Sequence, residues 1–359
     1  MSVFRPREPY THRLSKILEE YPDGSQILRE ILQNSDDAKS RSQTFLLLNG
    51  YYKSDLKLDR YQGPALLSKN DTIFDERDFR SLLNLANSEK RNQFDTIGVM
   101  GVGFNSIYHI TDSPTFITGD QYVILDPHSW YFDGGVKYNF INQNIAINHP
   151  DQFAPFINSF GIPYNKKVNG TIFRYPLRTS QDANDSEIST NEYNPNKILD
   201  IFDKFYNESI NCLLFLNSIE SIKFLELKEN ESVPKLLYSI EIVKLFGDPT
   251  LESVFVATFR QQKGNEKPQD SHWIIFGWLG NLNATAAYFN ETFKKKITDY
   301  KLIPNVGIAI PLNEPETIGR LFCYLPIPTM LTPFSASVHG HFAVNTNRRT
   351  IWSTIAEDL

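Results

Sequence analysis

Cysteine is almost absent from this chain of 359 residues, which contains only Cys212 and Cys323. The two lie far apart and form neither a CxxC pair nor a Cys/His spacing typical of zinc sites. The sequence therefore excludes a disulfide framework and a cysteine-held structural zinc, and it favours a reduced compartment. We expect both cysteines to be packed core thiols.

An apolar run long enough to cross a membrane, about 20 residues, is also missing. Residues 1–16 lack the apolar segment of a signal peptide. Positive charge is not in excess either, because the formal net charge is −6. No overall positive field would concentrate nucleic acid or an anionic membrane around the protein. We expect a cytoplasmic protein, with the nucleus left open, and neither a nucleic-acid nor a membrane partner.

What is present is ordinary globular composition, with 41% hydrophobic and 13% aromatic residues. Since single cores seldom grow beyond about 250 to 300 residues, this length favours two domains. Residues 179–196 are polar and show no apolar period, which is typical of a linker. We predict an N-terminal domain over residues 1–178 and a second domain over residues 197–359.

Hydrophobic periodicity predicts the order of the elements. Apolar residues at helical spacing predict helices over 12–20, 24–39, 75–87 and 197–211. Short apolar runs predict strands at 44–50, 64–70, 113–118, 121–126 and 170–178. Many strand-like runs follow the last helix, the first of them LLFLNSI at 213–219. The second domain is therefore expected to be strand-rich α/β.

Three polar residues share one face of the helix predicted over 24–39. At about 100° per residue, Asn34 lies about 40° and Asp37 about 20° around the axis from Glu30. A carboxylate can orient and deprotonate water, and an amide oxygen is a hard ligand for magnesium bound to phosphates. The solvated side of an amphipathic helix would give the same pattern. On these residues alone both interpretations stand.

A glycine-rich segment, GVMGVGFNSIYHITD, covers residues 98–112. Its glycines precede an apolar run at helical spacing, so successive N–H groups and the helix dipole would form an anion site suited to a triphosphate. A tight structural turn would show the same glycines. No GKS/T follows, which argues against a Walker site. The polar residues 87–96 ahead of it predict a mobile loop, and Lys90 would approach the phosphates if that loop closes as a lid.

Three segments stand in the order of the nucleotide-binding boxes of the GHKL ATPases: EILQNSDDA at 30–38, GVMGVGFNSIYHITD at 98–112 and NGTIFRYPLR at 169–178. Together with QGPALLSKND, LDPH, LPIPT and FAVNTNRRTIW, they make the chain resemble the sacsin-type repeats, relatives of the ninety-kilodalton heat-shock chaperones. The resemblance spans essentially the whole chain. It implies an α+β fold, a Bergerat (GHKL) two-layer α/β sandwich followed by a strand-rich, transducer-like α/β domain.

The resemblance also implies ATP and Mg²⁺ as ligands and a role for each matching residue. Glu30 would position the attacking water, Asn34 would hold magnesium, and Asp37 with Ala38 would line the adenine and ribose pocket. The phosphates would be cradled by Gly98, Gly101, Gly103 and Phe104, and Thr171 would lie near the adenine. On these grounds Glu30 is preferred as a catalytic residue over a solvated helix position.

Two features depart from the family pattern or extend it. The DxGxG box that anchors adenine is missing, because residues 69–74 read KNDTIF, so Asn70 or Asp71 must contact the base. In two-domain relatives a basic residue of the second domain reaches the γ-phosphate, and Arg349, or else Arg348, stands in a comparable loop. A structural ion pair or a surface turn would explain the two arginines equally well.

The expected function is slow Mg²⁺-dependent ATP hydrolysis that drives lid closure and conformational change in protein quality control. The alternative is a GHKL-fold interaction module with impaired nucleotide binding, which the missing DxGxG box motivates. A DNA-mismatch-repair or topoisomerase ATPase shares the boxes, but the net acidity and the LDPH and FAVNTNRRTIW segments oppose it. Expected partners are ATP or ADP and unidentified client or co-chaperone proteins, with self-association left open. Because the sequence ends at TIWSTIAEDL, soon after the NRR segment, we expect it to be part of a longer protein.

Overall fold

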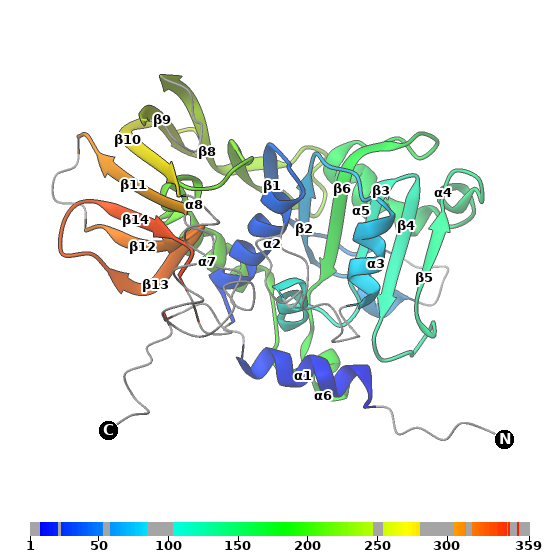
Figure 1. Cartoon of the computed structure of the whole chain (residues 1–359). Helices are drawn as coiled ribbons and strands as arrows, with labels where there is room; N and C mark the ends of the chain where they lie inside the picture. The colour runs from blue at the N-terminus through cyan, green and yellow to red at the C-terminus, as the bar shows by residue number, and fades with distance from the viewer. Residues whose placement is uncertain are drawn as a thin grey trace, which may run out of the picture.

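The computed structural model of the chain describes residues 8–20, 23–52, 58–84, 103–246, 254–280, 305–313, 318–342, 344, 350 and 351 (Figure 1). The predicted helices are present as α1 (Tyr10–Glu20), α2 (Ser25–Asp37) and α3 (Glu76–Asn84), and the helix predicted over 197–211 is split into α7 (Pro195–Tyr206) and α8 (Ser209–Leu213). The other helices are η1 (Asp59–Tyr61), η2 (Gly103–His109), α4 (Ile145–Asn148), α5 (Pro150–Phe160) and α6 (Ser180–Asp185). None of the helices within these ranges is long and apolar enough to cross a membrane.

One mixed sheet of fourteen strands runs through the described part of the chain, in the order β13-β12-β14-β11-β10-β9-β8-β7-β1-β2-β6-β3-β4-β5. β1 (Ser42–Asn49) pairs antiparallel with β2 (Ala65–Asn70) and parallel with β7 (Ser221–Lys228). The other strands are β3 (Thr115–Gly119), β4 (Gln121–Asp126), β5 (Gly134–Asn139), β6 (Val168–Pro176), β8 (Lys235–Phe246), β9 (Val254–Lys263), β10 (Gln269–Leu279), β11 (Asn305–Pro311), β12 (Arg320–Cys323), β13 (Leu325–Leu331) and β14 (Ser337–Gly340). The β1–β7 pairing joins the two halves of the molecule.

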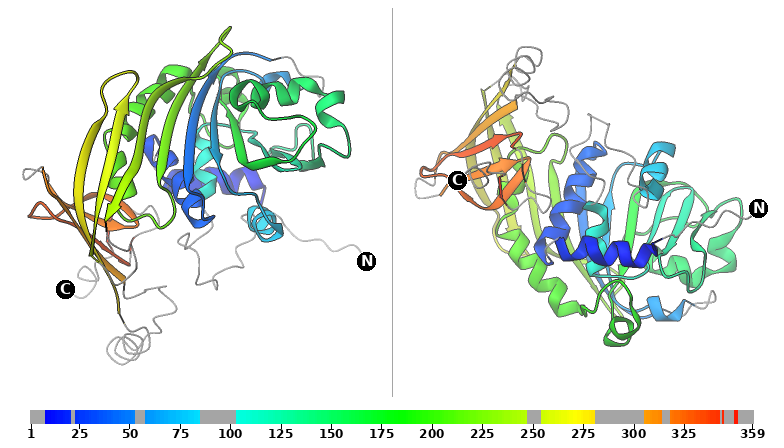
Figure 2. Two further views of the ribbon diagram at one scale, coloured as in Figure 1. Left: turned by 90° about the horizontal axis from the view of Figure 1, so that it is seen from above. Right: turned by 60° about the horizontal axis from the view of Figure 1, so that its bottom comes forward.

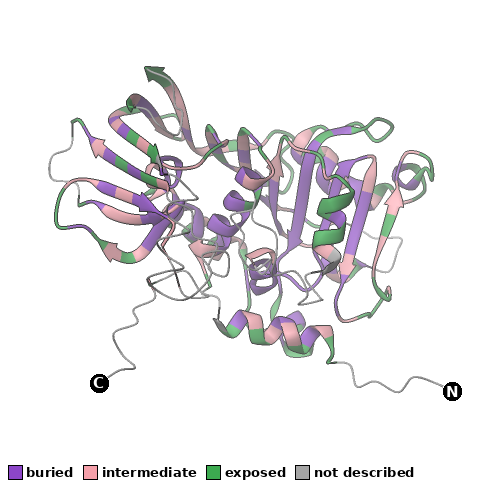
Figure 3. Ribbon diagram, viewed as in Figure 1, coloured by how far each residue is buried: buried purple, intermediate pink, exposed green. Residues whose placement is uncertain are grey.

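Both faces of the sheet are covered around β1. Because successive side chains of a strand point to opposite faces, Phe45 and Leu47 enter a core with α1, α2, η2 and α7, whereas Leu46 and Leu48 enter a second core with α5. The two helical layers can be followed in Figure 2. Figure 3 shows how completely β3 and β6 are buried between them. This region therefore has three layers, one more than the expected two-layer sandwich, since the run TFLLL is apolar on both faces.

Residues 179–196, predicted as a polar linker, fold onto the molecule. α6 begins with a capping box between Thr179 and Asp182. Ile188 and Tyr193 that follow are almost completely buried. Two isolated apolar residues carry no periodicity, so the sequence did not indicate that this stretch is anchored.

The run LLFLNSI at 213–219 was predicted as a strand, and this prediction is wrong. α8 ends at Leu213, and residues 214–220 form neither helix nor strand before β7. Leu214 and Ile219 are nevertheless buried. The backbone N–H groups of residues 217–219 bond to the Asp36 carboxylate instead of to a neighbouring strand. A side chain distant in sequence thus takes the place of strand pairing.

Neither cysteine forms a disulfide, and the predicted packing in the core is found for only one of the two. Cys212 is fully buried and Cys323 is half-buried. Burial raises the pKa of the Cys212 thiol to about 11, so it stays protonated and unreactive near neutral pH.

Candidate functional site

α2 carries the first of the three boxes. The helix follows Gly24, whose φ of 94° places it in a conformation that favours glycine, and its apolar stripe, with Leu28 and Leu32, lies in the core. The predicted polar face has graded exposure, because Glu30 is 2% exposed, Asp37 is half-buried and Asn34 is exposed. A buried carboxylate and an exposed amide therefore lie one turn apart on the same helix face.

The structure brings Glu30 together with the glycine-rich segment. Gln26 Nε2 donates a hydrogen bond to Glu30 Oε1 at 3.1 Å. A Cβ at Gly103 would lie 3.3 Å from the Glu30 carboxyl carbon and would overlap with Oε2. The missing side chain of Gly103 thus makes room for the carboxylate. Gly98 and Gly101, the other two glycines of the prediction, lie outside the described residues.

The helix expected after these glycines is a 3₁₀ helix, η2, which packs against α2 and α1. Ser106 Oγ donates to the carbonyl of Gly103 at 2.8 Å and closes its first turn. The ring of Phe104 packs on Phe173 with centroids 5.7 Å apart. Because this ring packs against the core, the predicted contact of Phe104 with a phosphate would fall to its backbone, and that contact stays a prediction.

Asn70 and Asp71, the predicted substitutes for the adenine anchor, make bonds within the protein. Asn70 Nδ2 donates to Ser35 Oγ of α2 at 3.1 Å, and Asn70 Oδ1 accepts from the N–H of Thr72 at 3.1 Å. The Asp71 carboxylate accepts from the Ser40 hydroxyl and, at 2.9 Å, from the N–H of Arg41. Both side chains thereby tie the end of β2 to the end of α2 and the start of β1.

Thr171 lies beside Asn70, because the two are directly paired in the β2–β6 ladder. The Thr171 hydroxyl is fully buried and donates to the carbonyl of Thr72 at 2.7 Å. Gly170 before it has a φ of 119°, and a Cβ there would overlap with the carbonyl oxygen of Asn70. At the glycine of the NGT triplet in the third box, the backbone of β6 therefore comes close to the backbone of Asn70, at the predicted adenine end.

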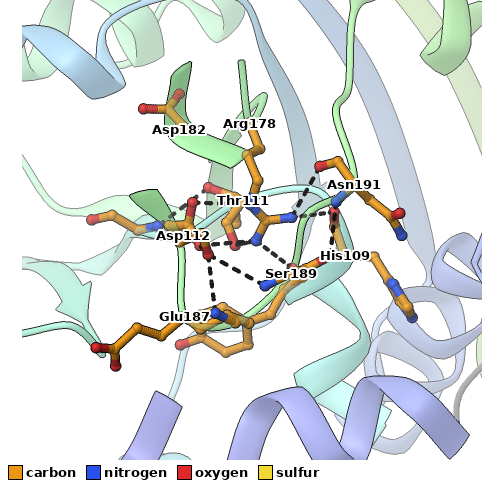
Figure 4. A network of polar contacts seen from close by, with 12 residues as sticks. His109, Thr111, Asp112, Arg178, Asp182, Glu187, Ser189 and Asn191 are labelled. Atoms are coloured by element: carbon orange, nitrogen blue, oxygen red, sulfur yellow. Dashed lines mark hydrogen bonds and ion pairs between the residues drawn. The ribbon is translucent and has the colours of Figure 1, made fainter. Parts of the chain in front are cut away.

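Arg178, the last residue of the third box, is buried in a polar network that the sequence analysis missed (Figure 4). Its guanidinium makes two bonds of 2.9 Å to the Asp112 carboxylate. It also donates to four backbone carbonyls, those of Tyr108, His109, Thr111 and Asn191. One arginine thus holds the end of η2 and the residues that follow it. A terminal Arg of a strand-like run gives no sequence signal for such a role.

Two further residues of α2, Arg29 and Asp36, were also missed. Arg29 is 4% exposed and bonds to the Glu208 carboxylate and to the carbonyl of Pro326, at 3.1 Å. Asp36 is 0% exposed and bonds to the segment before β7. In the sequence Asp36 looks as solvated as its neighbour Asp37. The signal that could have found them is the recurrence of polar residues at 29, 33 and 36, a second stripe on the helix.

The second half of the chain approaches α2 through Tyr324, which lies between β12 and β13. Its N–H donates to His339 Nδ1 at 3.1 Å, and its hydroxyl lies 2.6 Å from His341 Nε2. Burial, with a smaller contribution from the charge of Asp37, raises the pKa of Tyr324 to about 12. Burial also lowers the pKa of His339, a residue of β14, to about 4. Within the described ranges no group of three or more His, Cys, Asp or Glu side chains could hold a metal ion.

Arg348 and Arg349, predicted to reach the γ-phosphate, lie outside the described residues, as does Lys90. The described residues Val344 and Ile351 pair in an isolated antiparallel bridge. The contacts of the two arginines therefore stay a prediction.

Comparisons with known proteins support the resemblance. A family model described as the sacsin domain matches residues 7–239. Human sacsin (Homo sapiens) is 30% identical to the chain in an alignment 393 residues long, and this alignment includes 96% of the chain. The same alignment covers 8% of the human protein, so the chain spans a small part of that relative's length. By both comparisons, this chain belongs to the sacsin domain family.

Proposed function

We propose that this chain binds ATP with Mg²⁺ in the manner of the GHKL, heat-shock-protein-90-like ATPases and hydrolyses it slowly. The observation that carries the proposal is the contact between the buried Glu30 carboxylate and Gly103, the last glycine of the glycine-rich segment. Glycine-rich backbone segments before a helix are a type of segment that binds anions. A carboxylate held against such a segment can act as a general base for water attack on a bound phosphate.

Each residue of the α2 face has a chemical task in this proposal. Glu30, oriented by Gln26, accepts a proton from the attacking water. The amide oxygen of Asn34 is exposed one turn away, and it is a hard oxygen donor of the kind that magnesium accepts, so the residue fits the ion. When bound, Mg²⁺ neutralises charge on the phosphates. Arg349 or Arg348 would add a cation from the second half of the chain.

The wider role proposed is nucleotide-gated conformational change in protein quality control. It is supported by membership of the sacsin domain family and by the resemblance of the three boxes to the heat-shock chaperones. Because the chain spans only 8% of human sacsin, activities of that whole protein come to this chain only as proposals.

Calorimetric titration with Mg·ATP and Mg·ADP tests the binding. We expect saturable heat for the wild-type chain and its loss in Asn34→Ala, an exposed position where the fold tolerates truncation. We expect Glu30→Ala to bind ATP but to release no phosphate. Equal hydrolysis by the wild type and Glu30→Ala would remove Glu30 from the mechanism.

A second candidate, an interaction module with impaired nucleotide binding, is favoured by the adenine end. Asp71 is bonded to Ser40 and Arg41, and Thr171 donates its hydroxyl proton to Thr72. A base entering here must compete with these internal bonds. Absence of any heat with the wild-type chain selects this candidate.

A further inference from the structure

Two charged residues of α2 fasten this helix to the second half of the chain. Arg29 bonds to Glu208, which precedes α8, and to Pro326 in β13. The Asp36 carboxylate accepts three backbone N–H bonds, from Asn217 at 3.1 Å, Ser218 at 2.7 Å and Ile219 at 3.0 Å. The partners are 179 to 297 residues away in sequence from these two side chains. α2 is therefore bonded at two points, about 10 Å apart along its axis.

These two residues lie on a different face of α2 from the candidate catalytic residues. Positions 29 and 36 precede positions 30 and 37 by one residue, which is about 100° around the axis. One face thus presents Glu30 and Asn34, and the adjacent face bonds to α8, β13 and the segment before β7. Since a helix with intact backbone bonds moves as a unit, a shift of Glu30 also shifts both bonded side chains.

The bonds on the second face are difficult to break. Both side chains are almost completely buried, so each charge is withdrawn from water and depends on its protein partners. Bonds between a carboxylate and backbone N–H groups are charge-assisted and stronger than neutral ones. A small displacement of α2 is therefore passed to the bonded segments and not absorbed at the contact.

We infer that Arg29 and Asp36 are positioning residues, which set the Glu30 carboxylate against Gly103 and transmit nucleotide binding at α2 to the α8–β7 segment and β13. This inference rests on the proposed ATP function. It gives α2 two tasks, because the helix contacts nucleotide on one face and holds the second half of the chain on the other.

Hydrogen exchange with and without magnesium and a non-hydrolysable ATP analogue tests the inference. In the wild-type chain we expect the analogue to slow amide exchange about fivefold or more, both at residues 103–106 and at residues 217–219. In Asp36→Asn the effect at 217–219 is lost, while that at 103–106 remains. A merely structural role would lower stability without separating the two responses.

A second variant guards against misfolding of Asp36→Asn. Glu208→Gln leaves the sequence of α2 unchanged and removes only the negative charge of the half-buried partner of Arg29. We expect kcat to fall about tenfold with KM unchanged, because a misplaced Glu30 weakens the transition state and not substrate binding. The matched control is Glu220→Gln, which breaks an exposed ion pair with Arg41 that also joins the two halves. The control keeps wild-type kinetics and exchange.

The outcomes separate the inference from the function on which it rests. No slowing at either segment overturns both. Slowing at 103–106 alone in the wild type overturns the inference and leaves ATP binding in place. If Asp36→Asn retains the response at 217–219, the role of Asp36 is refuted.

Discussion

Gly103 has space for no more than a hydrogen atom on the side that faces Glu30, and it illustrates how single residues define the site. The atom that a Cβ would meet belongs to the end of a flexible side chain, so a substitution displaces the carboxylate and not the backbone. The same logic separates Gly103 from Gly170, where the obstructing atom is a backbone carbonyl.

We therefore expect Gly103→Ala to fold normally and to lose ATP turnover by about 100-fold, since a misplacement of about 1 Å can cost that much. Phosphate release and thermal unfolding, measured on the same preparation, check this. Gly50→Ala is the control, because its Cβ would lie 3.8 Å from the Tyr52 ring in ordinary contact. Unchanged turnover in Gly103→Ala would contradict the placement of Glu30.

The pH dependence of stability belongs to the residue scale as well. Burial lowers the pKa of His339 from 6.5 to about 4. As the pH falls below 6.5 the unfolded chain takes up a proton that the folded chain does not accept until about pH 4. The free energy of unfolding therefore falls across this window, by about 3 kcal/mol at 1.4 kcal/mol per pKa unit.

His339→Asn removes this titration while an amide oxygen replaces Nδ1 as acceptor for the Tyr324 N–H. We expect urea unfolding midpoints of the variant to depend less on pH between 6.5 and 4 than those of the wild type. His12→Asn, at an exposed position of α1, is the control and should keep the wild-type slope. Parallel slopes for His339→Asn and the wild type would show that His339 does not contribute.

At the scale of elements, Arg178 joins three segments. It follows the end of β6, and its guanidinium donates to a carbonyl at the end of η2. The Asp112 carboxylate that it binds also accepts a hydrogen bond of 2.7 Å from the Ser186 hydroxyl. Ser186 follows α6 in the segment predicted as a linker. η2, β6 and this segment therefore form one unit around a buried ion pair whose side chains are 0% and 1% exposed.

Arg178→Met leaves the Asp112 charge buried without its cation, and we expect a loss of about 3 to 5 kcal/mol in the free energy of unfolding. Urea denaturation measures it. Arg260→Met is the matched control, because it breaks an exposed pair with Asp270 between β9 and β10 and should leave the midpoint nearly unchanged. Similar midpoints for the two variants would argue against a structural role for the buried pair.

At the scale of the whole molecule, the net charge of −6 argues against DNA binding, which is the property of the mismatch-repair and topoisomerase ATPases that share the predicted boxes. Non-specific DNA binding depends on the neutralisation of phosphates by Lys and Arg. We therefore expect no mobility shift of duplex DNA at physiological salt, with or without ATP. A shift under these conditions would revive the mismatch-repair and topoisomerase class.

The helices α1, α2 and α3, and strands such as β1, β2 and β6, could be predicted from the sequence, because their apolar spacing is a local property. That Glu30 and Gly103 lie at one site could be predicted only from the order of the three boxes, which resembles that of the GHKL ATPases. Only the recurrence of polar residues at 29, 33 and 36 distinguished Asp36 from Asp37, and a polar stripe does not by itself indicate burial, although Asp36 is fully buried and Asp37 half-exposed. Asp36 is buried because its carboxylate faces the segment before β7 and accepts the N–H groups of residues 217–219.

The sequence by itself determined the local elements, the reduced cysteines and the family of the chain, since composition, periodicity and motif order do not require knowledge of distant contacts. Only the tertiary structure decided that LLFLNSI is not a strand, that residues 179–196 are anchored, and that Arg29, Asp36 and Arg178 are buried. The physical reason is common to these cases. A buried charge or an unpaired backbone is stabilised by hydrogen bonds to groups far away in sequence, and those groups become neighbours only when the sheet has formed.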